Sequence, residues 1–138
     1  MASSDSLGFG VIGTGAIGRL HAQHLVSRVP GARLVAVSDV VAEAAESCAQ
    51  TTGSTAYSDH HALLANPQVE AVVIASPPDT HAAIIEDAAA AGKQIFSEKP
   101  IDCTLDKIDR AIVAVTRAGV KLQVDCCLLE NSPRIARP

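Results

Sequence analysis

A lysine at the end of an apolar segment is the residue of this sequence that most directly suggests catalysis. The segment Lys93–Glu98 is predicted to be a buried strand, and it ends with Glu98 and Lys99 in front of Pro100. A proline biases the residue before it toward an extended conformation. A lysine held in a cleft at such a position can exchange a proton with a substrate hydroxyl group. The alternative for Lys99, on residue type alone, is an ordinary surface lysine.

Three glycines spaced as G-x-G-x-x-G follow the first apolar segment. They are Gly13, Gly15 and Gly18, and they lie between the predicted strand Leu7–Gly13 and a predicted helix. In this context the first glycine permits a tight turn, the second lets a pyrophosphate approach the backbone, and the third lets the helix pack close to the sheet. The helix N-terminus would then face the phosphate with free N–H groups. The motif predicts nucleotide binding, and a purely structural turn is the alternative.

An aspartate closes the second predicted strand, Arg33–Asp39. Asp39 follows the last glycine of the motif by roughly 20 residues, where a carboxylate can accept hydrogen bonds from the adenosine ribose and would repel a 2′-phosphate. Val40 and Val41 come next, and no Arg or Lys is nearby in the sequence to bind such a phosphate. Asp39 therefore favours NAD over NADP. S-adenosylmethionine can use the same geometry, and a solvated turn aspartate is the structural alternative.

A third set of candidates follows the predicted strand Glu70–Ser76. Ser76 and Pro77 lie at its carboxyl end, and such ends line the ligand crevice of open α/β sheets. His81 begins the apolar face of the next predicted helix. A single histidine at such a position is more often a packed or capping residue than a catalytic one.

These candidates are positioned by strands that alternate with helices. About six strands are expected, and the alternation predicts a parallel sheet with right-handed crossovers. The predicted fold class is therefore α/β, a doubly wound dinucleotide-binding (Rossmann) domain over residues 1–124. The remaining residues, 125–138, form a tail without clear periodicity, whose order the sequence does not predict.

The spacing of apolar residues predicts which face of each helix is buried. Threonines are expected to cap two of the helices at their N-termini. The predicted faces are Ile17, Leu20, His21, His24 and Leu25 in the first helix; His81, Ile84, Ile85, Ala88 and Ala89 in the helix capped by Thr80; and Leu105, Ile108, Ile112 and Val115 in the helix capped by Thr104.

Composition excludes several classes of protein. Of the 138 residues, 48% are hydrophobic but only 2% aromatic, which favours a core of Ala, Val, Ile and Leu between helices and a parallel sheet. The net charge of −4, with scattered Lys and Arg, argues against nucleic-acid binding, and no apolar run approaches the roughly 20 residues of a membrane helix. There is no secretory signal and no C-x-x-C pair among the four cysteines. We therefore expect reduced thiols, a cytoplasmic location and no metal site.

Together the motifs resemble the N-terminal half of the glucose–fructose oxidoreductase / inositol dehydrogenase / MocA family. The matching strings are GVIGTGAIGRLHAQHL, VAVSD, AVVIASPPDTHAAI and FSEKPI, which lie between Gly10 and about Val124. Several ordered motifs at family-like spacing are far more specific than any one alone, and the inositol 2-dehydrogenase type is the most similar.

The resemblance implies a role for each candidate residue. It also implies the reaction, which is hydride transfer between a polyol or sugar hydroxyl carbon and NAD. By the resemblance, Gly13, Gly15, Ala16 and Ile17 line the pyrophosphate, Asp39 binds the adenosine ribose, Ser76, Pro77 and His81 belong to the cofactor crevice, Glu98 lies near the nicotinamide, and Lys99 contacts the reacting substrate oxygen.

The sequence departs from the family pattern after its last predicted strand. Family members continue with an arginine-containing segment and a large antiparallel-sheet domain, which supplies the catalytic aspartate and histidine and the walls of the substrate site. Here Cys126 and Cys127 stand in that region, and that domain is missing from the sequence. The resemblance thus implies a cofactor site without the usual substrate site. An apolar surface left uncovered would favour association, so we expect a homodimer or a higher homo-oligomer.

Three functions remain open at this point. The first is an NAD-dependent oxidoreductase that acts on a small polyol or sugar, active only if another subunit or the tail closes the cleft. The second is an NAD-binding module without catalysis. The third is a hydrolase of an ester or lactone that uses His60, His61, His81 or a cysteine; it ranks last because no G-x-S-x-G motif is present.

Overall fold

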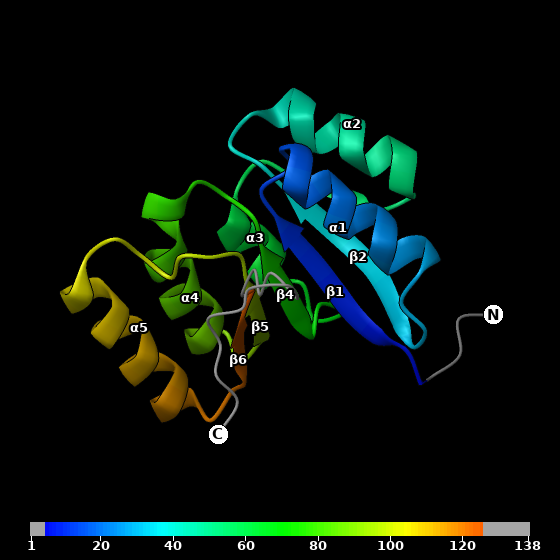
Figure 1. Ribbon diagram of the computed structural model, residues 1–138. Coiled ribbons are helices and arrows are strands. Elements are labelled where there is room, and N and C mark those ends of the chain that lie inside the picture. The colour runs from blue at the N-terminus through cyan, green and yellow to red at the C-terminus, as the bar shows by residue number, and fades with distance from the viewer. Residues whose placement is uncertain (1–4, 126–138) are drawn as a thin grey trace, which may run out of the picture.

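The computed structural model describes residues 5–125, and they form one Rossmann domain around a six-stranded parallel sheet (Figure 1). The predicted α/β fold class is therefore confirmed. The predicted tail, apart from Asp125, lies outside the described residues. The strands are β1 (Leu7–Ile12), β2 (Ala32–Ser38), β3 (Thr55–Tyr57), β4 (Ala71–Ile74), β5 (Gln94–Ser97) and β6 (Leu122–Val124).

The sheet has the strand order β3-β2-β1-β4-β5-β6, so the chain reverses its winding direction beside β1. β1 pairs with β2 on one side and with β4 on the other, and Ile12 lies opposite both Ser38 and Ile74. The carboxyl ends of β1, β2 and β4 therefore meet at one edge. This edge is the topological switch point, where open α/β sheets bind their ligands.

Helices cover both faces of the sheet (Figure 1). α1 and α2 pack on one face, while α3 and α4 pack on the other and α5 lies against α4. The described helices are α1 (Ala16–Ser27), α2 (Ala42–Thr52), α3 (His60–Leu64), α4 (His81–Ala90) and α5 (Leu105–Ala118), and a short 3₁₀ turn, η1 (Pro78–Thr80), precedes α4.

The predicted buried face of α4 is confirmed, because all five of its residues are buried. The face predicted for α1 is wrong in part. Leu25 is buried, but Ile17 and Leu20 are about half exposed, and Gly18 and Ala22 occupy the contact with the sheet instead. Small residues let the helix backbone approach the strands, and this close approach moves the larger apolar side chains to the flank of the helix.

The face predicted for α5 is also wrong in part. Leu105 is 76% exposed and Ile112 is 46% exposed, whereas Ala111 and Val115 are buried. α5 packs on α4 and makes few contacts with the strands. Its buried stripe is therefore narrow, and the small Ala111 side chain fits the helix–helix contact.

Neither threonine caps its helix through its side chain. The Thr80 hydroxyl instead donates to the Pro77 carbonyl and lies 2.7 Å from the Ser76 hydroxyl. At α5, the Asp102 carboxylate accepts the N–H group of Thr104. Both predicted caps are therefore replaced by hydrogen bonds within the preceding loop.

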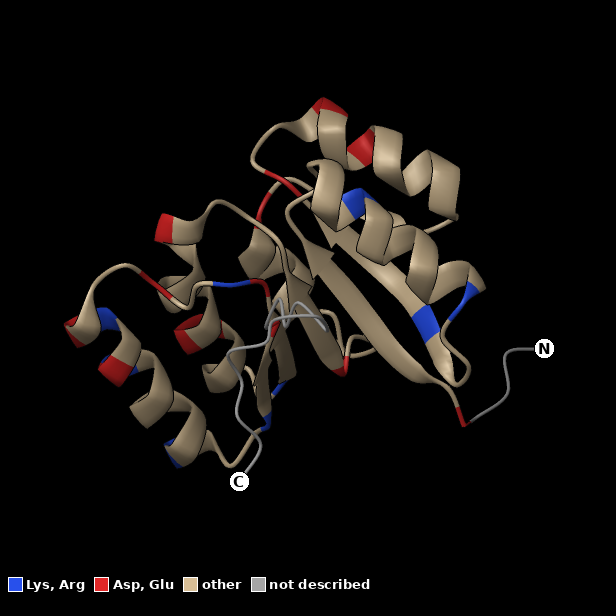
Figure 2. Cartoon of the chain, in the orientation of Figure 1, with Lys and Arg blue, Asp and Glu red and all other residues tan. Residues whose placement is uncertain are grey.

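Charged residues are spread over many elements (Figure 2). Lys and Arg occur on helices and at strand ends, intermixed with Asp and Glu, rather than as one basic stripe. Within residues 5–125, no helix is long and apolar enough to cross a membrane.

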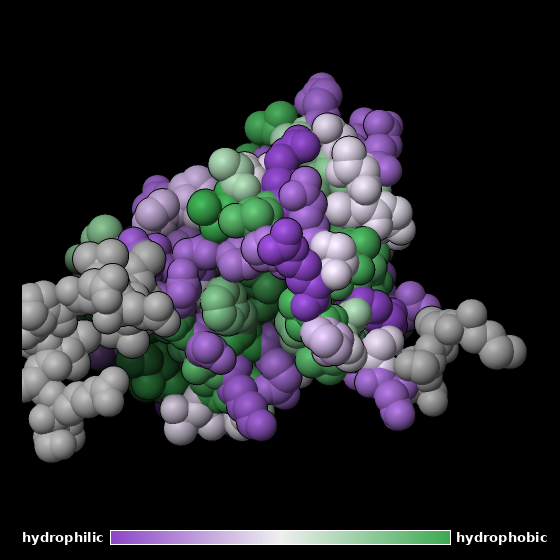
Figure 3. Space-filling model, turned by 45° about the vertical axis from the view of Figure 1, so that its right-hand side comes forward, coloured by the Kyte–Doolittle hydropathy of each residue, from purple (hydrophilic) through white to green (hydrophobic). Residues whose placement is uncertain are grey.

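One part of the sheet lacks a helical cover among the described residues. On the side of α1, the outer half of the sheet borders an open groove of about 980 Å³, which we call the apolar groove. In the space-filling view, apolar side chains (green) lie in the recessed middle of the surface with hydrophilic ones around them (Figure 3). The groove is lined mainly by apolar side chains, among them Phe9, Val29, Val73, Phe96 and Leu122.

Candidate cofactor site

The turn after β1 has the backbone geometry that its glycines predict. Gly13 has a φ of +93°, and a Cβ atom there would lie 2.6 Å from the backbone nitrogen of Ser76. L-residues with side chains rarely adopt such a φ. At Gly18 a Cβ atom would overlap the carbonyl oxygen of Gly13. Both residues must therefore be glycine for the turn to contact the β4 loop and for α1 to fold back on it.

Gly15 differs from the other two glycines. Its φ is −67°, and a Cβ atom would meet nothing within 4 Å. The residue is exposed, as are Ala16 and Ile17 in the first turn of α1. The first N–H groups of a helix have no partner within the helix. The open space in front of Gly15 therefore adjoins unpaired donors, which is the arrangement that a phosphate needs.

Asp39 lies at the carboxyl end of β2 and is hydrogen-bonded to the glycine turn. One carboxylate oxygen accepts the N–H of Thr14 at 2.8 Å and its hydroxyl at 3.0 Å. The other oxygen accepts the N–H of Val41 at 2.9 Å. The carboxylate thus joins the loops after β1 and β2, and its remaining lone pairs are free for a ligand.

The electrostatics keep Asp39 ionised. Partial burial works to raise the pKa of its carboxyl group. The hydrogen bonds from Thr14 and Val41 and the nearby positive charge of Arg19 together outweigh burial, so the pKa is lowered from the ordinary 3.8. Asp39 is therefore an anion at neutral pH.

Arg19 is a residue that reasoning from the sequence missed. No basic residue follows Asp39 closely in the chain, yet α1 brings this guanidinium group near its carboxylate. Arg19 donates to the carbonyls of Thr14 and Ala44 and lies 3.4 Å from the Ser47 hydroxyl. The spacing of one helical turn between Arg19 and Gly15 was the only signal in the sequence that could have placed it there.

Ser76 and Pro77 lie where the sequence predicts, in the loop after β4. Ala75 donates its N–H to the Ile12 carbonyl, so this loop is hydrogen-bonded to the end of β1. The hydroxyl groups of Ser76 and Thr80 are 2.7 Å apart. The β1 and β4 loops therefore form adjacent walls at the switch point.

His81 supports the site rather than facing it. The ring is 1% exposed. Its Nδ1 lies 2.7 Å from the Pro100 carbonyl oxygen and its Nε2 lies 2.7 Å from the Ser76 carbonyl oxygen. Since both ring nitrogens contact backbone acceptors, His81 connects the loops after β4 and β5. Neither nitrogen is available as a catalytic base, which weakens the hydrolase interpretation.

Glu98 connects β5 to α1. Its Oε1 lies 2.6 Å from Nε2 of His21, and its N–H donates to the Ile74 carbonyl. The His21 ring packs edge-on against the Phe96 ring, with the ring centroids 5.6 Å apart. The histidine of the first helix, predicted to face the core, is thus half-buried and holds the glutamate that precedes the candidate lysine.

Lys99 projects from the same edge of the sheet. It is exposed and makes no hydrogen bond or ion pair with any other residue of the 5–125 region. The peptide bond between Lys99 and Pro100 is cis. The described chain therefore places the lysine beside the candidate cofactor site but does not enclose it in the cleft that the sequence suggested.

Comparison with known proteins agrees with this geometry. Residues 7–126 match the family described as "Oxidoreductase family, NAD-binding Rossmann fold". The chain belongs to this family. Its described residues are accordingly an NAD-binding Rossmann domain of the inositol dehydrogenase-related oxidoreductases, and the suspected resemblance is confirmed.

Inositol dehydrogenases are among the similar proteins. The inositol 2-dehydrogenase of Rubrobacter xylanophilus is 40% identical over 119 residues, which are 86% of this chain and 34% of that protein. A putative myo-inositol dehydrogenase structure from Sinorhizobium meliloti is 42% identical with a TM-score of 0.81, and the match covers 87% of this chain and 36% of that one. The scyllo-inositol dehydrogenase of Lactobacillus casei, solved with NAD(H) and scyllo-inositol, is 28% identical with a TM-score of 0.82, covering 86% and 36%. This chain thus spans about a third of the length of these relatives.

Proposed function

We propose that this domain binds NAD at the switch-point edge and takes part in hydride transfer to or from a hydroxyl-bearing carbon of a polyol or sugar. The observation that carries the proposal is Asp39, held as an anion on the glycine turn by Thr14. A carboxylate so placed accepts hydrogen bonds from ribose hydroxyls and repels a 2′-phosphate. The solved Lactobacillus casei relative binds NAD(H), which supports the same choice of cofactor.

The glycine turn would hold the pyrophosphate. Gly15 leaves the backbone open, and Ala16 and Ile17 present the first N–H groups of α1. Arg19 already donates to Thr14 and Ala44, so its guanidinium group is committed to the protein rather than free to bind a 2′-phosphate. We therefore expect NAD to bind more tightly than NADP.

Lys99 would act at the substrate end of the site. Its ammonium group is exposed and unpaired within residues 5–125, so it can donate to the reacting substrate oxygen. Glu98, held by His21, would lie near the nicotinamide. Bound NAD would supply the hydride acceptor in the oxidative direction, and the hydroxyl proton would pass to solvent beside Lys99. Inositols are the first substrates to test, because the relatives named above act on them.

The first experiment is a calorimetric titration with NAD⁺ and NADP⁺. We expect saturable NAD⁺ binding that weakens at least about tenfold in Asp39→Ala, since a good charged hydrogen bond contributes about 1.5–3 kcal/mol. Glu43→Gln, an exposed acidic residue of α2, is the matched control for loss of negative charge and should bind normally. Absence of binding to both dinucleotides would overturn the proposal.

A turnover assay separates catalysis from binding alone. NADH formation from myo- and scyllo-inositol would be followed for the chain and for Lys99→Ala. We expect turnover that Lys99→Ala abolishes, with NAD⁺ affinity unchanged because the lysine makes no hydrogen bond or ion pair with another described residue. NAD⁺ binding without turnover on any polyol would support the alternative of a non-catalytic binding module.

We also propose that the apolar groove associates with a second copy of this chain. The groove is lined mainly by apolar side chains, which favour association when they are exposed, and it lies beside the β5 strand that leads to Lys99. Light scattering at working concentration should show a dimer or a larger species. A monomer would contradict this proposal and leave the cofactor proposal untouched.

A further inference from the structure

Two histidines and an aspartate converge on the side of the molecule where α3 meets α4. His60 and His61 are the first two residues of α3, and Asp87 lies in α4. The Asp87 Oδ2 atom lies 2.8 Å from Nε2 of His60 and 3.8 Å from Nε2 of His61. One carboxylate oxygen therefore faces two imidazole nitrogens that come from a different helix.

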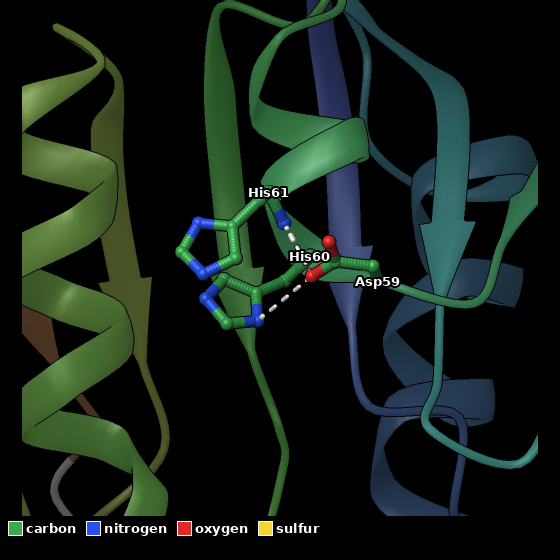
Figure 4. A group of neighbouring side chains, drawn as sticks. All are labelled: Asp59, His60 and His61. Carbon is green, nitrogen blue, oxygen red and sulfur yellow. Dashed lines mark hydrogen bonds and ion pairs between the residues drawn. The ribbon is translucent and has the colours of Figure 1, made fainter.

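The arrangement of the rings brings the two nitrogens to the same side. The ring centroids of His60 and His61 are 4.1 Å apart, with the planes tilted by 34°. Both rings extend from α3 in the same direction, while the Asp59 carboxylate lies on the other side of His60 (Figure 4). Adjacent residues of a regular helix point about 100° apart, so this stacked pair is a specific local arrangement.

The separations can accommodate a metal ion between the three atoms. Tetrahedral ligands at about 2.0–2.1 Å from zinc are about 3.3 Å from one another. The two distances to Asp87 Oδ2, 2.8 and 3.8 Å, lie on either side of that value. A hydrogen bond accounts for the contact with His60, but 3.8 Å is too long for one with His61. An ion between the three atoms would replace that hydrogen bond and bind all three groups.

A second carboxylate lies beside the first histidine. Asp59 Oδ1 lies 3.8 Å from Nδ1 of His60 and accepts the N–H of His61 at 3.0 Å. Histidines that bind metals usually direct their other nitrogen toward a carboxylate or carbonyl, which fixes the ring and raises its basicity. Asp59, His60 and His61 also offer ligand atoms within 4.8 Å of one another. A second carboxylate thus lies close to the two histidines.

Exposure leaves a path for an ion and for water. The side chains of His60, His61 and Asp87 are 24%, 63% and 38% exposed. Two imidazoles and one carboxylate suit zinc and its neighbours in the first transition series. Water would complete the coordination on the exposed side, next to His61.

We propose that His60, His61 and Asp87 form a site for a divalent transition-metal ion of the zinc type, which joins α3 to α4. This site is separate from the proposed NAD function and does not depend on it. From the sequence we predicted no metal site. The proposed ligands follow no spacing motif, and Asp87 is brought to the histidines only by the packing of α4 beside α3.

The test is a calorimetric titration of the untagged, metal-free protein with Zn²⁺ near neutral pH. We expect one ion per chain, with the affinity reduced at least about tenfold in His61→Asn and in Asp87→Asn, because each removes a ligand. Asp59→Asn should weaken binding less, since Asn preserves the N-cap. His24→Asn, a half-buried histidine of α1 outside the cluster, should bind as the unmodified chain does.

Two outcomes would overturn the proposal: no binding, or equal affinity in the unmodified chain and both ligand variants, which would mean that thiols or other groups bind the zinc. Thermal unfolding gives a second readout. Zinc should raise the Tm of the unmodified chain but not that of Asp87→Asn, whose fold is checked by its metal-free Tm and by unchanged NAD⁺ binding.

Discussion

The two faces of the sheet differ in how completely the described helices cover them. On one face, α3 and α4 pack on the strands and α5 extends the same core, which includes Leu63, Ile85 and Val115. On the other, α1 and α2 cover the β1–β3 half, and the rest borders the apolar groove. Stability is therefore concentrated on the first face. The second face combines the cofactor turn with apolar surface that no described helix covers.

The largest effect is expected from a cavity in the covered face. Ile85 of α4 is fully buried, so Ile85→Ala should lower the free energy of unfolding by about 3 kcal/mol, within the range for buried Ile-to-Ala changes. Chemical denaturation would measure the loss. Ile85→Val is the graded control and should cost about 1 kcal/mol. If Ile85→Ala lowered the free energy of unfolding by less than about 1 kcal/mol, this face would not be the main source of stability.

A smaller loss is expected where α1 approaches the sheet on the other face. Gly18→Ala would place a Cβ against the Gly13 carbonyl, and relieving such overpacking costs about 1–3 kcal/mol. At Gly15 an added Cβ atom has no neighbour within 4 Å, so Gly15→Ala should change the free energy of unfolding by roughly 0.5 kcal/mol or less. The same variant should weaken NAD⁺ binding, because the methyl group enters the space that the phosphate would occupy. The two variants should thus separate stability from binding, in denaturation and in calorimetry. Equal effects on both properties would argue against distinct roles for the two glycines.

The next effect depends on pH. The folded-state pKa of Asp39 is lowered below 3.8, so its contribution to stability is complete above the unfolded-state value and is lost as pH falls through the folded-state value. At pH 7, Asp39→Asn should therefore lower the free energy of unfolding by about 1 kcal/mol, because solvent screens this partly exposed charge and reduces its contribution. The difference from the unmodified chain should shrink below about pH 4. A pH-independent difference, measured by denaturation across this range, would assign the effect to packing rather than charge.

The smallest effect on stability is expected in the apolar groove. Val29 lines it and is 44% exposed, so Val29→Ser should change the free energy of unfolding by roughly 0.5 kcal/mol or less. The same change should shift the dimer toward monomer in light scattering if the groove is the contact surface. Val113→Ser, on the outer side of α5 at a similar exposure, is the control and should leave association unchanged. Equal association in both variants would exclude the groove.

Much of the fold could be predicted from the sequence because its signals are local. Strand positions follow from short apolar runs. β1, β4 and β5 lie within their predicted segments, and β2 begins one residue before its own, at Ala32. Gly53 and Gly119 end their helices in the left-handed conformation that glycine permits. The predictions for α1 and α5 failed because apolar spacing alone does not show how closely a helix approaches its neighbour. That distance depends on small residues such as Gly18 and Ala111.

The sequence by itself determined the order of strands and helices, the glycine turn and the acidic residue after β2, because these depend on backbone conformation and on residues close together in the chain. Only the tertiary structure decided which distant groups meet. It brings Arg19 near Asp39, connects Glu98 to His21, buries His81 between two loops and places Asp87 against His60. Each of these contacts arises from the packing of helices on a sheet whose strand order is not the chain order, and no local pattern of residues encodes that geometry.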